Sequence, residues 1–170
     1  MTKTRIVQGL ALLFVIGILG IFVVNLKDQG EVVGVGDQAY DFQLEDQNGE
    51  VHQLSDYAGK PIVLNFFTTW CSSCQEQAPS MIDFEKEFAD DVQVFTIVKA
   101  ESKRTLEKYV ERTGYTDRLY VFDFDTDVSD RYGVTGQPET IIIDKDGTIV
   151  DHIIGPIPGD KVATLVSDLL

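Results

Sequence analysis

The fold is decided by one stretch, Asn65-Phe66-Phe67-Thr68-Thr69-Trp70-Cys71-Ser72-Ser73-Cys74, in which two contrasting patterns meet at a pair of cysteines. Residues 62–67 form a short, almost wholly apolar run, which is typical of a strand buried on both faces. Residues 72–89 carry apolar side chains at helical spacing, and Pro79 is expected to kink that helix. The sequence therefore predicts a strand, a tight connection and a helix, with both cysteines at the start of the helix.

The two cysteines are the only ones in the chain, and their position predicts redox chemistry. Unpaired backbone N–H groups and the positive end of the helix dipole stabilise a thiolate at a helix start. We expect Cys71 at the first exposed position, with Cys74 one turn later on the same face. The pair can therefore close a small disulfide ring and exchange it with another disulfide through a mixed disulfide.

Three other interpretations of the pair are open, although each is less favoured. A structural disulfide is one, but closing so short a loop stabilises a fold only slightly. Half of a zinc site is another, but the two histidines, His52 and His152, are predicted on distant strands as ordinary half-exposed residues. A chance C-x-x-C is the third, and the flanking strand, Trp70 and helix argue against it.

A second motif, Gly133-Val134-Thr135-Gly136-Gln137-Pro138-Glu139-Thr140, precedes another apolar run at residues 141–143. Proline cannot donate a hydrogen bond to a sheet, so Pro138 marks the start of a strand or a tight turn. The pattern alone leaves the isomer of its peptide bond open, with trans the commoner form.

The rest of the chain alternates predicted strands and helices. Hairpins are expected around Asn48-Gly49 and Asp146-Gly147, which separate pairs of apolar runs. Further strands are predicted at residues 92–98 and 119–124, and further helices at residues 102–113, 126–132 and 160–170. This alternation predicts an α/β fold whose central sheet contains parallel strands and carries helices on both faces.

The amino-terminal segment is of a different kind, because residues 6–26 contain no charged side chain. As a helix this run spans about 30 Å, the thickness of a bilayer core. It lacks the small-x-small cleavage site of a signal peptide, so we expect an uncleaved anchor. Lys3 and Arg5 precede it, which predicts a cytoplasmic tail at 1–5, a transmembrane anchor at 6–26, an extracytoplasmic tether at 27–36 and a globular domain at 37–170.

Acidic residues dominate the chain, with 28 Asp and Glu against 14 Lys and Arg and a net charge of −14. This balance argues against nucleic acid and anionic membrane surfaces as partners. Basic residues are nevertheless enriched at Lys99, Lys103, Arg104, Lys108, Arg112 and Arg118. A docking face for an acidic partner is one interpretation, but interleaved Glu101, Glu107 and Glu111 favour a solvated helix face.

Taken together, the stretch 65–74 and the segments 133–140 and 143–147 resemble the thioredoxin fold. More narrowly, they resemble the membrane-anchored TlpA/ResA-type thiol-disulfide oxidoreductases, which are related to the cytochrome c maturation thioredoxins. The hairpin at 42–49 with the segment 54–61 is similar to that family's amino-terminal addition, and residues 92–124 resemble its inserted helix and strand. The resemblance covers about residues 36–170. It implies a central mixed sheet with helices on both faces, an amino-terminal β-hairpin and a single amino-terminal transmembrane helix.

The resemblance also implies roles for individual residues. Cys71 would attack and Cys74 would resolve, so that the redox-active disulfide replaces any cofactor or metal. Pro138 would be cis and lie against the cysteine loop, the Gln137 backbone would pair with an incoming peptide, and Trp70 would flank the site. The implied activity is reduction of disulfides in exported proteins such as apocytochrome c, at the extracytoplasmic side of the cell membrane, with electrons from a membrane thiol carrier.

The chain departs from the family pattern at positions that matter for proton transfer. Asn65 stands where thioredoxins carry a buried Asp, and Gln77 stands where ResA-type proteins often carry Glu. Gln77 shares a helix face with Cys74, so it can donate a hydrogen bond but cannot take a proton, whereas Glu76 should face solvent. Glu139 is then the better candidate for a nearby carboxylate, and we hypothesise that it tunes deprotonation of Cys74.

Two other functions are weighed against the oxidoreductase. A thiol peroxidase would use Thr68-x-x-Cys71 as part of a peroxiredoxin signature, but Leu64 stands where that signature has proline. A copper-binding assembly factor would use Cys71 and Cys74 as ligands, but such proteins have a wider C-x-x-x-C and a nearby histidine. The oxidoreductase is the favoured function.

Overall fold

The computed structural model describes residues 31–170, of which Val32–Leu170 form one compact unit. The predicted cytoplasmic tail and transmembrane anchor, and part of the predicted tether, lie outside the described residues. No helix within residues 31–170 is both long enough and apolar enough to span a bilayer. Val33 and Gly36 donate backbone hydrogen bonds to Arg131 and Ile149, so the ordered contacts of this unit begin a few residues before residue 37.

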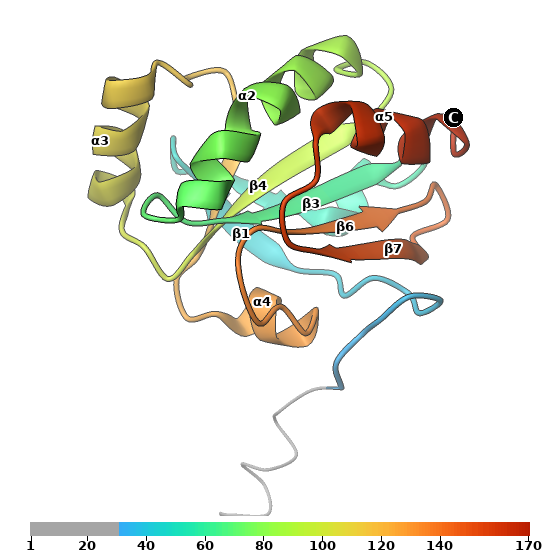
Figure 1. The fold of residues 1–170 in the computed structure, drawn as a ribbon. Coiled ribbons are helices and arrows are strands. Elements are labelled where there is room, and N and C mark those ends of the chain that lie inside the picture. Colours follow the sequence, from blue (N-terminus) through green and yellow to red (C-terminus); the bar gives the residue numbers. More distant parts are fainter. Residues whose placement is uncertain (1–30) are drawn as a thin grey trace, which may run out of the picture. The chain divides into compact units, whose positions relative to one another are not determined.

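Strands form one mixed sheet at the centre of this unit (Figure 1). They are β1 (Gln43–Asp46), β2 (Val51–Gln53), β3 (Ile62–Phe67), β4 (Gln93–Lys99), β5 (Tyr120–Asp123), β6 (Glu139–Ile143) and β7 (Ile149–Ile154). Their order across the sheet is β2-β1-β5-β4-β3-β6-β7. β3, β4 and β5 are parallel, whereas β1 and β6 pair antiparallel with β5 and β3. The predicted α/β fold, its mixed sheet and both hairpins are confirmed.

Helices cover both faces of the sheet, as predicted. α2 (Ser72–Glu87), α3 (Lys103–Thr113) and α5 (Gly159–Ser167) lie on one side, and α4 (Asp127–Arg131) lies on the other (Figure 1). A 3-10 turn, η1 (Leu54–Tyr57), follows β2. α2 is continuous through Pro79, and it ends at Glu87 rather than at residue 89.

The central strand β3 is buried at every position, which explains why all its residues except Asn65 are apolar. Leu64 and Phe66 pack on the α4 side, whereas Val63 packs against α2 and α5 on the opposite side. A strand enclosed on both faces has no free direction in which to shift. The end of β3 at Phe67 therefore fixes where the connection to α2, with both cysteines, must lie.

α2 and α5 pack against each other at a glycine. A Cβ atom at Gly159 would overlap the backbone carbonyl of Ser80, and the Gly159 N–H donates to the Ser80 hydroxyl at 3.2 Å. Only glycine allows so close an approach of the two backbones. This contact holds the segment before α5, which contains Ile157, against the middle of α2.

The solvated basic helix face predicted from the sequence is wrong in part. Lys99 ends β4 and donates to the Val134 carbonyl at 3.1 Å, and Lys103 pairs with Glu45 at 2.6 Å. Arg118 lies before β5, not on α3, and it is buried with its guanidinium donating to the Glu85 carboxylate at 2.6 and 3.0 Å. Glu101 is engaged by Thr69 instead of standing free between lysines. Arg104 and Lys108 do lie exposed on α3, as expected. Periodicity placed the helix but could not show which charges had distant partners.

Candidate redox site

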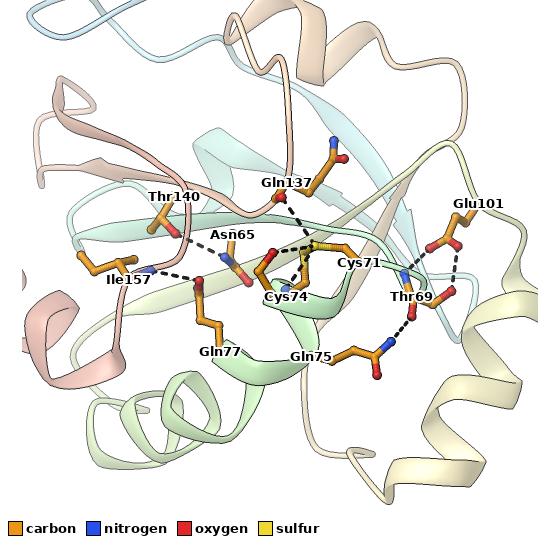
Figure 2. The surroundings of a disulfide bond; sticks show 11 residues. Asn65, Thr69, Cys71, Cys74, Gln75, Gln77, Glu101, Gln137, Thr140 and Ile157 are labelled. Carbon is orange, nitrogen blue, oxygen red and sulfur yellow. Dashed lines mark hydrogen bonds between the residues drawn. A yellow bond between two sulfur atoms is a disulfide. The ribbon is translucent and has the colours of Figure 1, made fainter.

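Cys71 and Cys74 form a disulfide at the amino end of α2 (Figure 2). Cys71 is the residue that caps the helix, and its sulfur accepts a hydrogen bond from the Cys74 N–H at 3.2 Å. Cys71 is only 7% exposed and Cys74 only 3%, so the expectation that Cys71 is an exposed residue is wrong. Its sulfur is nevertheless the one that receives the helix amide. A thiolate at Cys71 is stabilised by that N–H and by the helix dipole.

The loop between α4 and β6 also lies against the disulfide. The Gln137–Pro138 peptide bond is cis, as the family resemblance implied. Gln137 lies half-buried, and its carbonyl oxygen is 3.5 Å from the Cys71 sulfur. The Pro138 carbonyl accepts a hydrogen bond from the Gly155 N–H at 3.0 Å, which ties the loop to the end of β7. The loop thus presents backbone atoms directly beside the sulfur predicted to react.

The segment before Cys71 is fixed by polar contacts that sequence reasoning did not identify. The Thr69 N–H and hydroxyl each donate to the Glu101 carboxylate at 2.7 Å, and the Gln75 side chain donates to the Thr69 carbonyl at 2.7 Å (Figure 2). Trp70, the next residue, is 71% exposed. An anchored backbone therefore displays a large apolar side chain to solvent beside the disulfide, as expected for Trp70.

Two buried side-chain amides, those of Asn65 and Gln77, lie near the cysteines (Figure 2). Asn65 donates from Nδ2 to the Thr140 hydroxyl at 3.3 Å, which links β3 to β6 (Figure 2). Gln77 is buried on the same side of α2 as Cys74, as predicted, while Glu76 is exposed, also as predicted. The Gln77 amide oxygen accepts from the Ile157 N–H at 3.1 Å, so its hydrogen bond goes to the backbone before α5 and not to a cysteine. Neither side-chain amide can accept a proton from a cysteine and pass it on.

Glu139 follows the cis proline and is almost completely buried. Its Oε1 accepts hydrogen bonds from the N–H groups of Thr135 and Gly136 at 3.0 and 2.8 Å. Its Oε2 lies 2.7 Å from Nε2 of His152. The carboxylate thus closes the proline loop on itself and joins it to β7. Its predicted influence on Cys74 remains a prediction.

His152 is a site-supporting residue that the sequence treated as an ordinary strand histidine. In the β6–β7 hairpin, His152 stands opposite Ile141, so it is the diagonal neighbour of Glu139 on the same face. Cross-strand diagonals of this kind bring long side chains into contact. The turn at Asp146-Gly147 could not have revealed the pair, because a β-bulge between Ile142 and Ile143 shifts the register before it reaches Glu139.

These elements can carry out thiol–disulfide exchange. The disulfide sits at a helix start, one sulfur receives a helix N–H, and exposed and backbone groups surround it for contact with another protein. No third thiol competes, because the chain has two cysteines in all. The arrangement favours dithiol exchange, since Cys74 is already within bonding distance to resolve a mixed disulfide at Cys71.

Comparison with known proteins agrees with this chemistry. The profile of the AhpC/TSA family matches residues 35–152. The chain is 33% identical to a thiol-disulfide oxidoreductase named ResA from Geobacillus thermodenitrificans, over 92% of this chain and 91% of that protein. It is 34% identical to the protein named ResA from Bacillus subtilis, over 85% of this chain and 81% of that protein.

Solved structures show the same fold. The exposed lipoprotein thioredoxin Etrx1 of Streptococcus pneumoniae superposes with a TM-score of 0.71 at 29% identity, covering 76% of this chain and 100% of that one. A thiol:disulfide interchange protein DsbE from Chlorobium tepidum gives 0.70 at 28% identity, covering 78% and 94%. The thioredoxin-like fold predicted from the cysteine and proline motifs is therefore confirmed.

Proposed function

The chain belongs to the AhpC/TSA family and is a thiol-disulfide oxidoreductase of the ResA type, and from this premise we propose that it reduces disulfides of exported proteins outside the cytoplasm. The observation that carries the proposal is the Cys71–Cys74 disulfide at the start of α2, facing the Gln137 carbonyl of the cis-proline loop. An exchange site of this form serves a protein substrate, because its neighbours are backbone groups and an exposed Trp70.

The reaction transfers two electrons and two protons to the substrate. In the reduced protein, the Cys71 thiolate attacks one sulfur of a substrate disulfide and releases the other as a thiolate. The Cys74 thiolate then attacks the mixed disulfide at Cys71, which frees the second substrate thiol and forms the Cys71–Cys74 bond. A dithiol donor returns the pair to its reduced form by the same exchange in reverse.

The membrane setting rests on the amino-terminal sequence. The uncharged run at 6–26, with Lys3 and Arg5 before it, supports an anchor that leaves the redox domain on the extracytoplasmic side. In that setting the donor would be a membrane thiol carrier, and apocytochrome c is the substrate that the resemblance to cytochrome c maturation thioredoxins suggests. Two cysteines and no others suit an exported reductant, because no further thiol can mispair with Cys71.

Three groups of the site have roles in this proposal. The Gln137 backbone would pair with the substrate chain, and Trp70 would contact apolar side chains next to the substrate disulfide. Glu139 would tune deprotonation of Cys74 when the disulfide is reduced. Measuring both cysteine pKa values and the exchange rate in Glu139→Gln tests that last role, and unchanged values would show that the carboxylate serves the loop alone.

A trapping experiment tests the proposal as a whole. The Cys74→Ser variant of the full chain, expressed in cells, keeps the attacking sulfur but cannot resolve the mixed disulfide. We expect exported proteins linked to Cys71, and we expect none with Cys71→Ser as the matched control. The proposal fails if no partner is captured and the wild-type protein reduces no protein disulfide. Turnover of peroxide, or tight Cu(I) binding by the reduced cysteines, would instead support the thiol peroxidase or the copper factor.

A further inference from the structure

Three metal-binding side chains meet at the β1–β2 hairpin, away from the cysteines. Asp46, Glu50 and His52 each offer one ligand atom, and these atoms all lie within 4.8 Å of one another. Within residues 31–170 this is the one group of three such side chains that is close enough to share an ion. We propose that these three residues bind a divalent transition-metal ion of the Zn²⁺ class, in a structural site distinct from the redox centre.

His52 supplies the strongest reason. Its side chain is 11% exposed, and its Nδ1 lies 2.6 Å from the hydroxyl of Tyr57 in η1. When Nδ1 donates its proton to Tyr57, Nε2 presents a lone pair. Among the described residues that Nε2 has no hydrogen-bond partner, although it is buried, and the nearest carboxylate oxygen, Asp46 Oδ2, is 3.5 Å away. A buried ring nitrogen without a partner is costly, and a metal ion would satisfy it.

Asp46 is oriented like a ligand. Its Oδ1 accepts hydrogen bonds from the N–H groups of Asn48 and Glu50, both at 2.8 Å, which fixes the carboxylate plane. Its Oδ2 accepts a longer hydrogen bond from Asn48 Nδ2 at 3.3 Å and also faces Nε2 of His52. Two ligands of a tetrahedral zinc ion stand about 3.4 Å apart, given metal–ligand bonds near 2.1 Å. The observed 3.5 Å between Oδ2 and Nε2 matches that spacing without a change of backbone.

Glu50 completes the set from the solvent side. It is exposed and lies in the turn between the two strands, so its carboxylate can move the remaining distance onto an ion held by the other two. Water would fill a fourth position. Two carboxylates and a neutral imidazole carry two negative charges, which balance a divalent cation.

The kind of ion follows from the donor atoms. Calcium and magnesium prefer oxygen ligands alone, whereas an imidazole nitrogen with carboxylates suits zinc and its first-row neighbours. Zinc binds such nitrogen and oxygen ligands readily in tetrahedral sites. The ion would join β1, β2 and, through Tyr57, the 3-10 turn. Its site lies at the β2 edge of the sheet, whereas the cysteines follow β3.

The test uses the full chain, stripped of metal and oxidised, so that the Cys71–Cys74 disulfide cannot ligate the ion. Zn²⁺ is titrated in a calorimeter, and Co²⁺ is followed by its visible spectrum. We expect one equivalent to bind, a cobalt spectrum without sulfur-to-metal charge transfer, and a rise of the melting temperature with Zn²⁺. His52→Gln should abolish binding, and Glu50→Gln should weaken it at least ten-fold.

Two further variants separate a metal site from a general effect. Tyr57→Phe removes only the group that orients His52, and we expect about ten-fold weaker binding, as for other second-layer partners of metal ligands. His152→Gln changes the other histidine and should bind Zn²⁺ like the wild type. The proposal is overturned if the oxidised chain binds no Zn²⁺, if binding needs reduced cysteines, or if Glu50→Gln and His52→Gln bind as tightly as the wild type. Glu50 is exposed, so that variant remains informative even if His52→Gln unfolds.

Discussion

Thr69 is held by the carboxylate of Glu101, which accepts one hydrogen bond from the Thr69 N–H and one from its hydroxyl, both at 2.7 Å. The two residues come from different connections, β3–α2 and β4–α3. Their contact therefore decides how firmly the backbone just before Trp70 and Cys71 is fixed.

Replacing Glu101 with alanine should loosen that connection. We expect a loss of about 1–3 kcal/mol in the free energy of unfolding, because two hydrogen bonds to a charged group are removed. The Thr69 amide should also exchange with solvent faster, and exchange at Cys71 should slow. Denaturant unfolding, amide hydrogen exchange and a disulfide reduction assay measure these effects. Glu107→Ala on the exposed face of α3 is the control, and equal effects from both variants would contradict the role of Glu101.

Gly159→Ala should destabilise the packing of α5 on α2. The new Cβ would overlap the Ser80 carbonyl, and a backbone atom cannot move aside as a flexible side chain can. Overpacking of this kind costs about 1–3 kcal/mol. Denaturant unfolding measures the loss, with Lys161→Ala, at an exposed position of the same helix, as the control. If Gly159→Ala unfolds at the same denaturant midpoint as the wild type, the two helices can shift apart to accommodate the Cβ atom without loss of stability.

The sequence predicted the elements and the chemistry well because both follow local patterns. The buried run before Trp70, the helical spacing after Cys74 and the turns at Asn48-Gly49 and Asp146-Gly147 each specify a local structure. The two cysteines needed no distant information, since a helix start acts on them directly. The isomer of Pro138 came from family resemblance and not from the local pattern.

Three contacts that the sequence missed are pairs of polar side chains far apart in the chain or across a hairpin. Thr69 with Glu101, Arg118 with Glu85, and His152 with Glu139 depend on which strands become neighbours and in what register. Charge patterning compares positions within one helix, so it treated Arg118 and Glu101 as solvated. The order of strands places each beside a partner more than thirty residues away or across a hairpin, which no local periodicity encodes.

Glu85→Gln should be among the most destabilising single changes in this domain. It would leave the buried Arg118 guanidinium without its counter-charge, and its Nη2 lies only 2.6 Å from the carboxylate now. Breaking a buried pair from one side costs about 3–5 kcal/mol. The double variant Glu85→Leu with Arg118→Met, in which no charge is buried, should recover much of that loss. A double-mutant cycle in denaturant checks both, and purely additive losses would exclude the coupling.

Asp46 should make the free energy of unfolding depend on pH. Burial opposes its ionisation, but hydrogen bonds from the Glu50 and Asn48 N–H groups hold its pKa below the ordinary value. A carboxyl whose pKa is lowered by folding stabilises the fold above its unfolded pKa of about 3.9, and that contribution is lost as pH falls through the lower folded value.

Asp46→Asn should therefore be less stable than the wild type by about 1–2 kcal/mol at pH 7, with the difference shrinking below pH 4. Urea unfolding at several pH values, in EDTA so that no metal contributes, measures it. Asp56→Asn, in the exposed part of the 3-10 turn, is the control. A difference that is constant from pH 7 to pH 3 would rule out the carboxylate charge as its source.

His152→Ala should affect the cis-proline loop more than the rest of the domain. The change removes the partner of Glu139 Oε2, which lies 2.7 Å from the His152 ring in a buried position. The carboxylate keeps its bonds to the Thr135 and Gly136 N–H groups, so the loop stays closed but loses its link to β7. We expect a loss of about 1–3 kcal/mol in unfolding free energy.

Because the Gln137 carbonyl of the same loop faces Cys71, we also expect weaker capture of substrate by a Cys74→Ser trap carrying this change. Val150→Ala, at an exposed position of β7, is the matched control. If His152→Ala lowers stability as stated but traps substrate as well as the control does, then the histidine supports the sheet and has no part in presenting the loop.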